Sequence, residues 1–255
     1  MTDNLRVDDP RAGVRTLTLN RPERLNALDG DLVAALRSEI ANAGSDIRVI
    51  VIQSEGRAFC AGADLKWLAS GILADHSAHA QFQEALGSLF TEIESASQAV
   101  IAAVNGYAFA GGLELTLACD IVVVSDDAQV GDEHINKNLL PGGGGSQRLP
   151  RKIGLARGLE VLLTGRRMTG QQVVDYGLAV KCVSIAELHA EALEMATILA
   201  LKDGQAIKYM KQMVRRGIEL PLREGLSLEL YLQSRYRADS AAMDEGVANF
   251  AKSGA

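Results

Sequence analysis

The fold of this chain is decided by residues 105–120, which read NGYAFAGGLELTLACD. A strand-like apolar run at 100–104 leads into this stretch, and a glycine pair, Gly111 and Gly112, interrupts it. A short apolar run follows at 113–118, with one carboxylate, Glu114, close to its start. If this run is a helix, its first turn has free backbone N–H groups and a partial positive charge. Such a helix end can stabilise a developing oxyanion, with Glu114 as a candidate proton carrier.

A second segment of the chain has the same organisation. Residues 59–66 read FCAGADLK, follow an expected strand and loop, and open an expected helix. Each segment offers a backbone N–H at a helix start, and two converging N–H groups would form an oxyanion hole. Loss of one donor from such a hole costs roughly 3–4 kcal/mol in barrier height. The alternative is two ordinary tight turns that use glycine for its backbone freedom.

Length and composition allow one large α/β domain or a core with a small appendage. The chain has 255 residues, of which 47% are hydrophobic, and a net charge of −6. A sizeable core is therefore expected, and the acidic balance argues against nucleic acid or an anionic membrane as the main partner. Three scattered cysteines (Cys60, Cys119 and Cys182) fit a reducing compartment. Without a signal-peptide pattern or an apolar run of membrane-spanning length, the sequence predicts a cytoplasmic protein.

Strand and helix patterns alternate over about three quarters of the chain, and helices alone complete it. This order predicts an α/β core over residues 1–200 and a C-terminal helical region over 201–255. The expected strands lie at 14–19, 49–53, 100–104, 121–125 and 180–183. The expected helices lie at 29–43, 65–73, 80–94, within 148–163, and at 170–176, 185–201, 205–216, 222–237 and 241–252.

Other candidate motifs carry less chemistry. Residues 141–148 read PGGGGSQR, which lacks the ending of a phosphate-binding P-loop and is typical of a tight loop that enters a helix. His76 and His79 have no further ligand nearby, so we predict no metal site. His134 follows Asp132 and Glu133 just before the glycine-rich loop. A lone histidine is more often a packing residue than a catalytic one, and no G-x-S-x-G motif supports a serine hydrolase.

Taken together, several of these motifs resemble the enoyl-CoA hydratase/isomerase (crotonase) superfamily. The resemblance covers nearly the whole chain. It implies a spiral of repeated ββα units with C-terminal helices that build trimers, often paired into hexamers, and that cover the active site. The motifs that carry it are NRP at 20–22, LNAL at 25–28, AFCAGADLK at 58–66, VNGY at 104–107, GGLEL at 111–115, CDI at 119–121 and PGGGGSQRL at 141–149, continued by LTGR at 163–166 and GLA at 177–179.

The resemblance also implies a substrate class. The substrate would be an acyl-CoA or enoyl-CoA thioester, with coenzyme A as part of the substrate and no separate cofactor. The backbone N–H groups of Ala63 and Gly111 would bind the thioester oxygen and stabilise an enolate-like intermediate. The family often has a lysine where Glu23 stands here, and Arg24 is the candidate substitute. The coenzyme A pocket would be lined by Arg24, Leu25, Ala61, Asp64, Leu65 and Lys66.

The resemblance is weakest where the reaction is decided. Hydratases of this family use two glutamates around one water, and Glu114 occupies the first position. Counting from Gly131 to Pro141 without gaps, the second position is His134, a residue type whose pKa of about 6.5 suits proton transfer. A one-residue shift would bring in Glu133 instead. Without that shift, adjacent side chains of an extended segment point to opposite sides.

The leading hypothesis is therefore a lyase of fatty acid metabolism, an enoyl-CoA hydratase with Glu114 and His134 as its acid/base pair. Alternatives on the same fold are an enoyl-CoA isomerase, an acyl-CoA hydrolase and a decarboxylase. An alternative of another class is an acyl-CoA binding protein without turnover. We expect Trp67 to line the acyl pocket, and Phe250 and Lys252 to contact the coenzyme of a neighbouring subunit.

Overall fold

Two β-sheets form the body of the protein, whose computed structural model describes residues 4–252. The large sheet has the order β1-β2-β3-β5-β7-β10, and the small sheet has the order β4-β6-β8-β9. Strands β1 and β9 are antiparallel to their neighbours, and all other pairs are parallel. The bounds are β1 Leu5–Arg11, β2 Val14–Leu19, β3 Val49–Ser54, β4 Ala58–Cys60, β5 Ala99–Val104, β6 Tyr107–Phe109, β7 Ile121–Ser125, β8 Gln129–Gly131, β9 Met168–Thr169 and β10 Lys181–Val183.

Successive strands of the core alternate between the two sheets. The pairs β3–β4, β5–β6 and β7–β8 each place their first strand in the large sheet and their second in the small sheet, and helical segments follow each pair. The chain therefore winds as repeated ββα turns. The segments that follow are α2 (Leu65–Trp67), η2 (Leu68–Ile72) and α3 (His76–Ser95) after β4, α4 (Gly111–Ala118) after β6, and η3 (His134–Lys137), α5 (Gly145–Ile153) and α6 (Leu155–Thr164) after β8.

Aspartate caps set the start of the long helices. The Asp29 carboxylate accepts a hydrogen bond of 2.9 Å from the N–H of Leu32, which begins α1 (Gly30–Ala41). Asp75 accepts bonds from the N–H groups of Ser77 and Ala78. Helix α3 therefore begins at His76, four residues before the start that the apolar pattern predicts.

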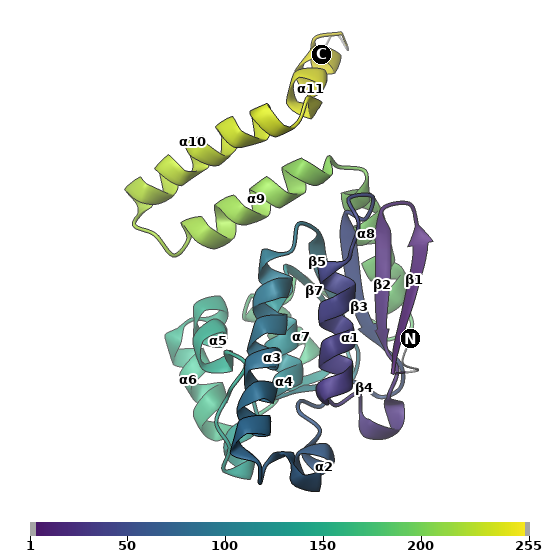
Figure 1. Ribbon diagram of the computed structural model, residues 1–255, viewed down its shortest axis with the longest axis vertical. Coiled ribbons are helices and arrows are strands. Elements are labelled where there is room, and N and C mark those ends of the chain that lie inside the picture. The colour runs from purple at the N-terminus through teal and green to yellow at the C-terminus, as the bar shows by residue number, and fades with distance from the viewer. Residues whose placement is uncertain (1–3, 253–255) are drawn as a thin grey trace.

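The large sheet is covered on both faces, as Figure 1 shows for the helices around it. Along β3, Ile50 and Ile52 belong to the main core with α1, α3 and α4, whereas Val49 and Val51 pack under α8 (Leu188–Ala200). This period of two explains why the strand reads as a continuous apolar run. All eight residues of α4 are buried, so the helix that carries Glu114 lies inside the core.

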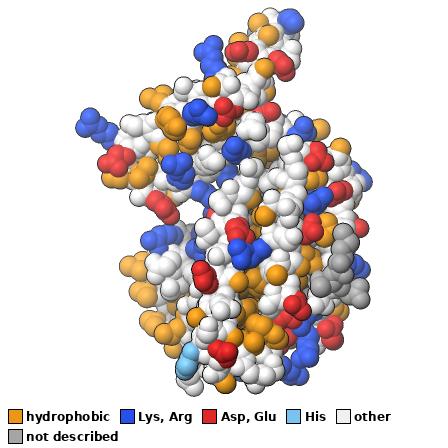
Figure 2. All heavy atoms as spheres, in the orientation of Figure 1, with side chains coloured by type: hydrophobic (Ala, Val, Ile, Leu, Met, Phe, Trp, Pro, Cys, Tyr) orange, Lys and Arg blue, Asp and Glu red, His pale blue; other side chains and the backbone are white. Residues whose placement is uncertain are grey.

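The C-terminal helices extend away from this body. Helices α9 (Gly204–Gly217), α10 (Leu222–Asp239) and α11 (Ala242–Lys252) follow α7 (Gly170–Asp175) and α8, and they confirm the three helices that the sequence predicts there. In Figure 1, α10 and α11 project at the end of the molecule opposite α2. Along α10 the side chains of Leu222, Leu226 and Leu230 are 79%, 52% and 67% exposed, and Figure 2 shows apolar side chains gathered on this arm.

The strands of the small sheet and the edge strand β1 escape prediction from the sequence. Strands β4, β6, β8 and β9 have only two or three residues each, and β1 is an edge strand with alternating charges and a proline. The glycine-rich loop enters its helix within the motif 141–148, because α5 begins at Gly145. Gly154 divides the region 148–163 between α5 and α6. Within residues 4–252, every helix is too short or too polar to cross a lipid bilayer.

Candidate active site

Three turns meet at one edge of the small sheet. Strands β4, β6 and β8 are parallel neighbours, so their carboxyl ends lie together. Residues 61–64 follow β4, residues 110–111 follow β6, and residues 132–134 follow β8. The carboxyl edge of a parallel sheet is a usual place for a binding site. The topology therefore brings together the two glycine turns and the segment of His134, which are far apart in the sequence.

The first two turns touch each other through glycine. A Cβ built on Gly111 would lie 3.2 Å from the Cα of Gly62 and 3.4 Å from the amide nitrogen of Ala63. A Cβ built on Gly112 would lie 1.9 Å from the carbonyl oxygen of Cys60. Only glycine permits this approach, which brings the amide nitrogens of Ala63 and Gly111 close together. Within the described part of the chain, neither N–H donates a backbone hydrogen bond.

Ala110 sets the direction of the second turn. Its backbone has φ 51° and ψ −115°, which is unfavourable for a residue with a side chain, and it precedes the first residue of α4. Its N–H donates a hydrogen bond of 3.0 Å to the carbonyl of Gly131, which ties the turn to β8. Strained backbone of this kind is typical of binding sites, where neighbouring structure holds it in place.

The two segments expected to bind coenzyme A are joined by backbone hydrogen bonds. The N–H of Ala61 donates to the carbonyl of Leu25 at 3.0 Å, and the N–H of Asp64 donates to the carbonyl of Leu28 at 2.8 Å. The Asp64 carboxylate is buried, binds the Arg21 guanidinium at 3.1 Å and caps α2. Arg21 is a residue that the sequence analysis missed, and it holds both segments in place.

The other predicted pocket residues lie on the outside of these segments. Arg24, Leu65 and Lys66 are exposed, which leaves them available to a ligand at the surface. Trp67 is half-buried, with its ring edge against Phe82 of α3 at a centroid distance of 4.9 Å. Phe250 and Lys252 lie on α11, remote from α2 in Figure 1, so in a single chain they do not border the site.

Glu114 is held inside the site by the glycine-rich loop. Its Oε1 accepts hydrogen bonds from the N–H groups of Gly143 at 2.9 Å and Gly145 at 2.8 Å, and the residue is 1% exposed. Burial raises the pKa of Glu114. The two N–H groups and the charge of His134 work against that increase, and the charge of Asp132 adds to it. The result is a carboxyl group with a raised pKa, suited to exchanging a proton near neutral pH.

His134 lies close enough to Glu114 for the charges of the two groups to act on each other. Its Nδ1 is 2.9 Å from Oδ1 of Asp132, and its side chain is only 13% exposed. Burial lowers the pKa of His134, but the hydrogen bond and charge of Asp132, together with the charge of Glu114, outweigh it and raise the pKa overall. The structure thus brings together Glu114 and His134, as the sequence analysis expects, and adds Asp132.

Glu133 points elsewhere. Its carboxylate forms an ion pair with Arg167, and its backbone is in the left-handed region with φ 52°. That conformation turns the chain between Asp132 and His134, so the side chains of these two residues meet while Glu133 faces away. A one-residue shift that would replace His134 by Glu133 is therefore not the arrangement found.

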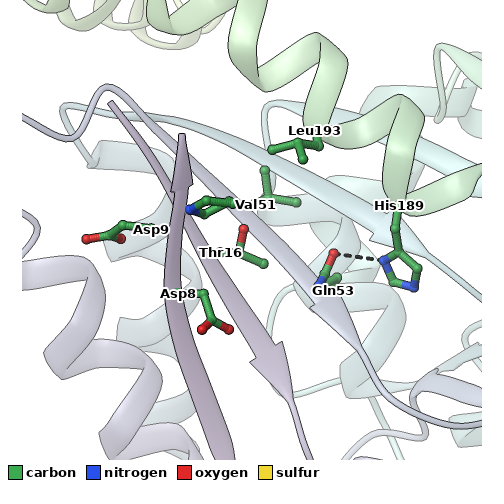
Figure 3. Close-up of a pocket in the computed structure, with 8 residues that line it drawn as sticks. Asp8, Asp9, Thr16, Val51, Gln53, His189 and Leu193 are labelled. Atoms are coloured by element: carbon green, nitrogen blue, oxygen red, sulfur yellow. Dashed lines mark hydrogen bonds between the residues drawn. The ribbon is translucent and has the colours of Figure 1, made fainter. Parts of the chain in front are cut away.

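Several cavities lie outside this site. One, of about 490 Å³, lies between β1–β3 and α8 and is lined by Asp8, Gln53 and His189, with His189 Nδ1 2.8 Å from Gln53 Oε1 (Figure 3). A second, of about 340 Å³, lies between α9 and α10, and a third, of about 820 Å³, lies between α3, α5 and α9. None of the three is lined by Glu114, Asp132 or His134. Across residues 4–252, no group of three or more His, Cys, Asp or Glu side chains has the geometry of a metal site.

Comparisons with known proteins agree with the family resemblance. The family profile named enoyl-CoA hydratase/isomerase matches residues 9–254. A probable enoyl-CoA hydratase (echA8) of Mycobacterium bovis is 37% identical over 95% of this chain and 92% of the relative. The 2,3-dehydroadipyl-CoA hydratase of Escherichia coli is 37% identical over 93% of this chain and 91% of the relative.

Solved structures agree as well. The enoyl-CoA hydratase of Bacillus anthracis superposes with a TM-score of 0.92 at 32% identity, over 98% of this chain and 96% of the other. An enoyl-CoA hydratase from Polaromonas superposes with the same TM-score at 31% identity, over 98% and 97% of the two chains. The expected crotonase-like α/β spiral is confirmed.

Proposed function

The chain belongs to the enoyl-CoA hydratase/isomerase family, and from that premise we propose that it catalyses the reversible addition of water to a 2-enoyl-CoA. Membership of the family makes it an enzyme of coenzyme A thioesters. The observation that carries the specific proposal is Glu114, a buried carboxyl group with a raised pKa, held one turn from the Gly111 N–H and facing the charge of His134.

The reaction starts with polarisation of the thioester. The N–H groups of Ala63 and Gly111 donate hydrogen bonds to the thioester oxygen and stabilise negative charge as it develops there. That charge makes the β-carbon of the enoyl group electrophilic. Because both donors are backbone groups fixed by close glycine contacts, they need no rearrangement during the reaction.

Glu114 and His134 divide the proton transfers. Ionised Glu114 takes a proton from water as the water oxygen bonds to the β-carbon, and the π electrons move onto the thioester oxygen. The enolate then takes a proton from His134 at its α-carbon, which completes the addition of one water molecule. Glu114 has gained a proton and His134 has lost one, and proton exchange between them restores the starting state.

Coenzyme A would bind at the two segments that backbone hydrogen bonds join, residues 25–28 and 61–64. We propose that Leu25, Ala61, Asp64 and Leu65 shape this pocket and that Arg24 and Lys66, exposed beside it, bind the phosphates of the coenzyme. The coenzyme is then part of the substrate, and the reaction as written requires no other cofactor. Trp67, whose ring packs edge-to-face against Phe82, would border the acyl chain.

The experiment is hydration of 2-enoyl-CoA thioesters of several chain lengths by the wild type, Glu114→Gln and His134→Gln. Each variant should lose about 10²- to 10⁴-fold in kcat, the usual effect of removing a general acid or base, while still binding a saturated acyl-CoA. Glu133→Gln is the matched control, since Glu133 faces Arg167. A wild type that leaves every enoyl-CoA unchanged would refute the hydratase proposal.

A second reaction is supported by the same groups. A carboxyl group and an imidazole around one enolate can also move a proton between the α- and γ-carbons, which would make the protein an enoyl-CoA isomerase. Hydrolysis and decarboxylation remain alternatives on the same fold. Product analysis in the hydration assay separates them, because isomerisation, free coenzyme A and CO₂ each leave a distinct product.

The quaternary structure belongs to the proposal as well. We propose that α9, α10 and α11 join three copies into a trimer, with two trimers able to form a hexamer, and that Phe250 and Lys252 reach the coenzyme of a neighbouring subunit. The exposed leucines of α10 support this assembly, since they lie on one face at intervals of four residues. A cytoplasmic location stays a prediction of the sequence.

A further inference from the structure

We propose that Asp132 is a positioning residue for the hydration reaction: its buried carboxylate holds Nδ1–H of His134, so that Nε2 of His134 faces the substrate as a proton donor. The inference rests on the proposed function and deepens it. Asp132 is 1% exposed, and the sequence gives it no role beyond its place two residues before His134.

The hydrogen bond fixes which nitrogen carries a proton. An ionised carboxylate can only accept hydrogen bonds, so Nδ1, at 2.9 Å from Oδ1 of Asp132, must be the protonated nitrogen. Nε2 is then the nitrogen that gains or loses a proton. The same Oδ1 accepts a second bond, of 3.4 Å, from the backbone N–H of His134. Asp132 therefore fixes both the tautomer and the orientation of the ring.

Burial makes the pair interdependent. A carboxylate that is 1% exposed is costly unless a positive charge lies beside it. Oδ2 of Asp132 has no hydrogen-bond partner within residues 4–252, so the cationic ring of His134 is its main source of stabilisation. Conversely, the Asp132 charge favours the cation of His134, so the imidazole stays ready to donate a proton at a higher pH than a free histidine would.

Glu114 also belongs to this arrangement. A Cβ built on Gly145 would lie 2.9 Å from Oδ2 of Asp132 and 3.2 Å from Oε1 of Glu114, so oxygens of both carboxylates approach the same point beside Gly145. The charges of both carboxylates act on His134 and raise its pKa. The result is a cluster of one imidazole and two carboxyl groups.

Apart from Arg148, whose charge also acts on Glu114, the remaining charged groups named here are engaged elsewhere or exposed. Helix α6 packs against η3, and α5 packs against α4. Lys137 of η3 is exposed. The other pairings are Glu133 with Arg167, Glu160 with Arg166, Arg157 with the ring of Tyr176, and Arg148 with Glu94.

The test measures the His134 ring directly. The chain has only four histidines, so NMR of histidine-labelled protein gives few ring signals, and the signal lost in His134→Gln identifies the residue. In the wild type, His134 should titrate above the usual histidine pKa of about 6.5 with Nδ1 protonated, and in Asp132→Asn its pKa should fall by about one unit or more. Glu133→Gln, changed one residue away, should leave the titration in place.

The kinetic measurement tests the catalytic consequence. Asp132→Asn should lower kcat/KM for hydration by about 10- to 100-fold near neutral pH, move its basic limb to lower pH, and leave the affinity for a saturated acyl-CoA within about twofold. A merely structural role would lower activity without moving that limb. An unchanged His134 pKa in Asp132→Asn overturns the inference, and so does an ordinary or lower His134 pKa in the wild type, a result that requires no variant to fold.

Failure of the proposed function gives a different pattern. If the wild type hydrates no enoyl-CoA while the His134 pKa falls in Asp132→Asn, the hydratase role is lost and Asp132 still orients His134. If hydration occurs and Asp132→Asn alters neither the ring titration nor the basic limb, the hydratase stands and the role of Asp132 is refuted.

Discussion

At the scale of single residues, the candidate site buries two carboxyl groups and one imidazole, so that little of their surface is exposed to water. Glu114 and Asp132 are each 1% exposed, and the charges of both act on His134. The sequence indicates Glu114 and His134 as partners, because both lie at motif positions. It does not reveal Asp132, because the contact depends on the left-handed backbone of Glu133, which no pattern of residue types predicts.

The ionised form of Glu114 lowers the free energy of unfolding of the protein. Its pKa is raised in the folded protein, so its contribution to stability is present below the ordinary value of 4.5 and is lost as the pH rises through the folded pKa. The variant Glu114→Gln keeps an oxygen for the N–H groups of Gly143 and Gly145 but carries no charge. We expect a gain of about 1 kcal/mol at neutral pH, or roughly 2–4 °C in Tm, together with loss of activity. Thermal unfolding at several pH values checks this, and a gain that does not shrink at low pH contradicts it.

The charges of Asp132 and residue 134 should be coupled. His134→Glu alone would crowd three carboxylates into one buried site, so one of them would be forced to hold a proton. Adding Asp132→Asn removes that crowding. We expect the activity of the double variant to exceed that of His134→Glu by about tenfold or more. In the wild-type background, by contrast, Asp132→Asn lowers activity. Kinetics of the four enzymes measure the coupling, and purely additive effects would argue against it.

At the scale of elements, the glycine-rich loop serves Glu114 instead of a phosphate. Its N–H groups at 143 and 145 bind the Glu114 carboxylate, which explains why a run of glycines stands there without the ending of a P-loop. The sequence predicts a tight loop into a helix, and this is confirmed. The contact of this loop with Glu114 could not be predicted, because it joins residues about thirty positions apart.

Gly143 is one position at which this loop tolerates no side chain. A Cβ there would lie 2.3 Å from Cε2 of Phe90 and 2.6 Å from Oε2 of Glu114. Gly143→Ala should displace Glu114, lower kcat roughly 100-fold and destabilise the fold by about 1–3 kcal/mol. Gly87→Ala on α3 is the control, since nothing lies within 4 Å of its added Cβ, and it should stabilise the protein by about 0.5–1 kcal/mol. Equal effects of both substitutions on kcat would refute the argument.

At the scale of the whole molecule, the arm formed by α9, α10 and α11 exposes a leucine face that the rest of residues 4–252 does not cover. If the arm joins subunits, Leu226→Glu should convert a trimer or hexamer to smaller species, because it places a charge in the middle of the leucine face. Glu224→Lys, on the opposite side of α10, should leave the assembly intact. Light scattering measures the molar mass of the wild type and the two variants. A wild type that is monomeric at micromolar concentration would contradict the proposal.

Most of the fold is predictable from the sequence, and the exceptions share a cause. Long buried strands such as β3 and amphipathic helices such as α3 have clear periodicity, and they occur where expected. The small sheet was missed, because strands of two or three residues have no measurable period. Yet that sheet assembles the site, since β4, β6 and β8 end at its three turns.

Each of these three turns follows a different strand of the small sheet, and a backbone hydrogen bond from Ala110 to Gly131 ties the turn after β6 to the end of β8. The N–H groups of Ala63 and Gly111, which would bind the thioester oxygen, lie outside the segment 132–140. We expect that this segment can be exchanged while those two N–H groups stay in place. A library randomised over 132–140 would retain a site for enolates and sample new proton donors, which makes this chain a starting point for selecting reactions it does not yet perform.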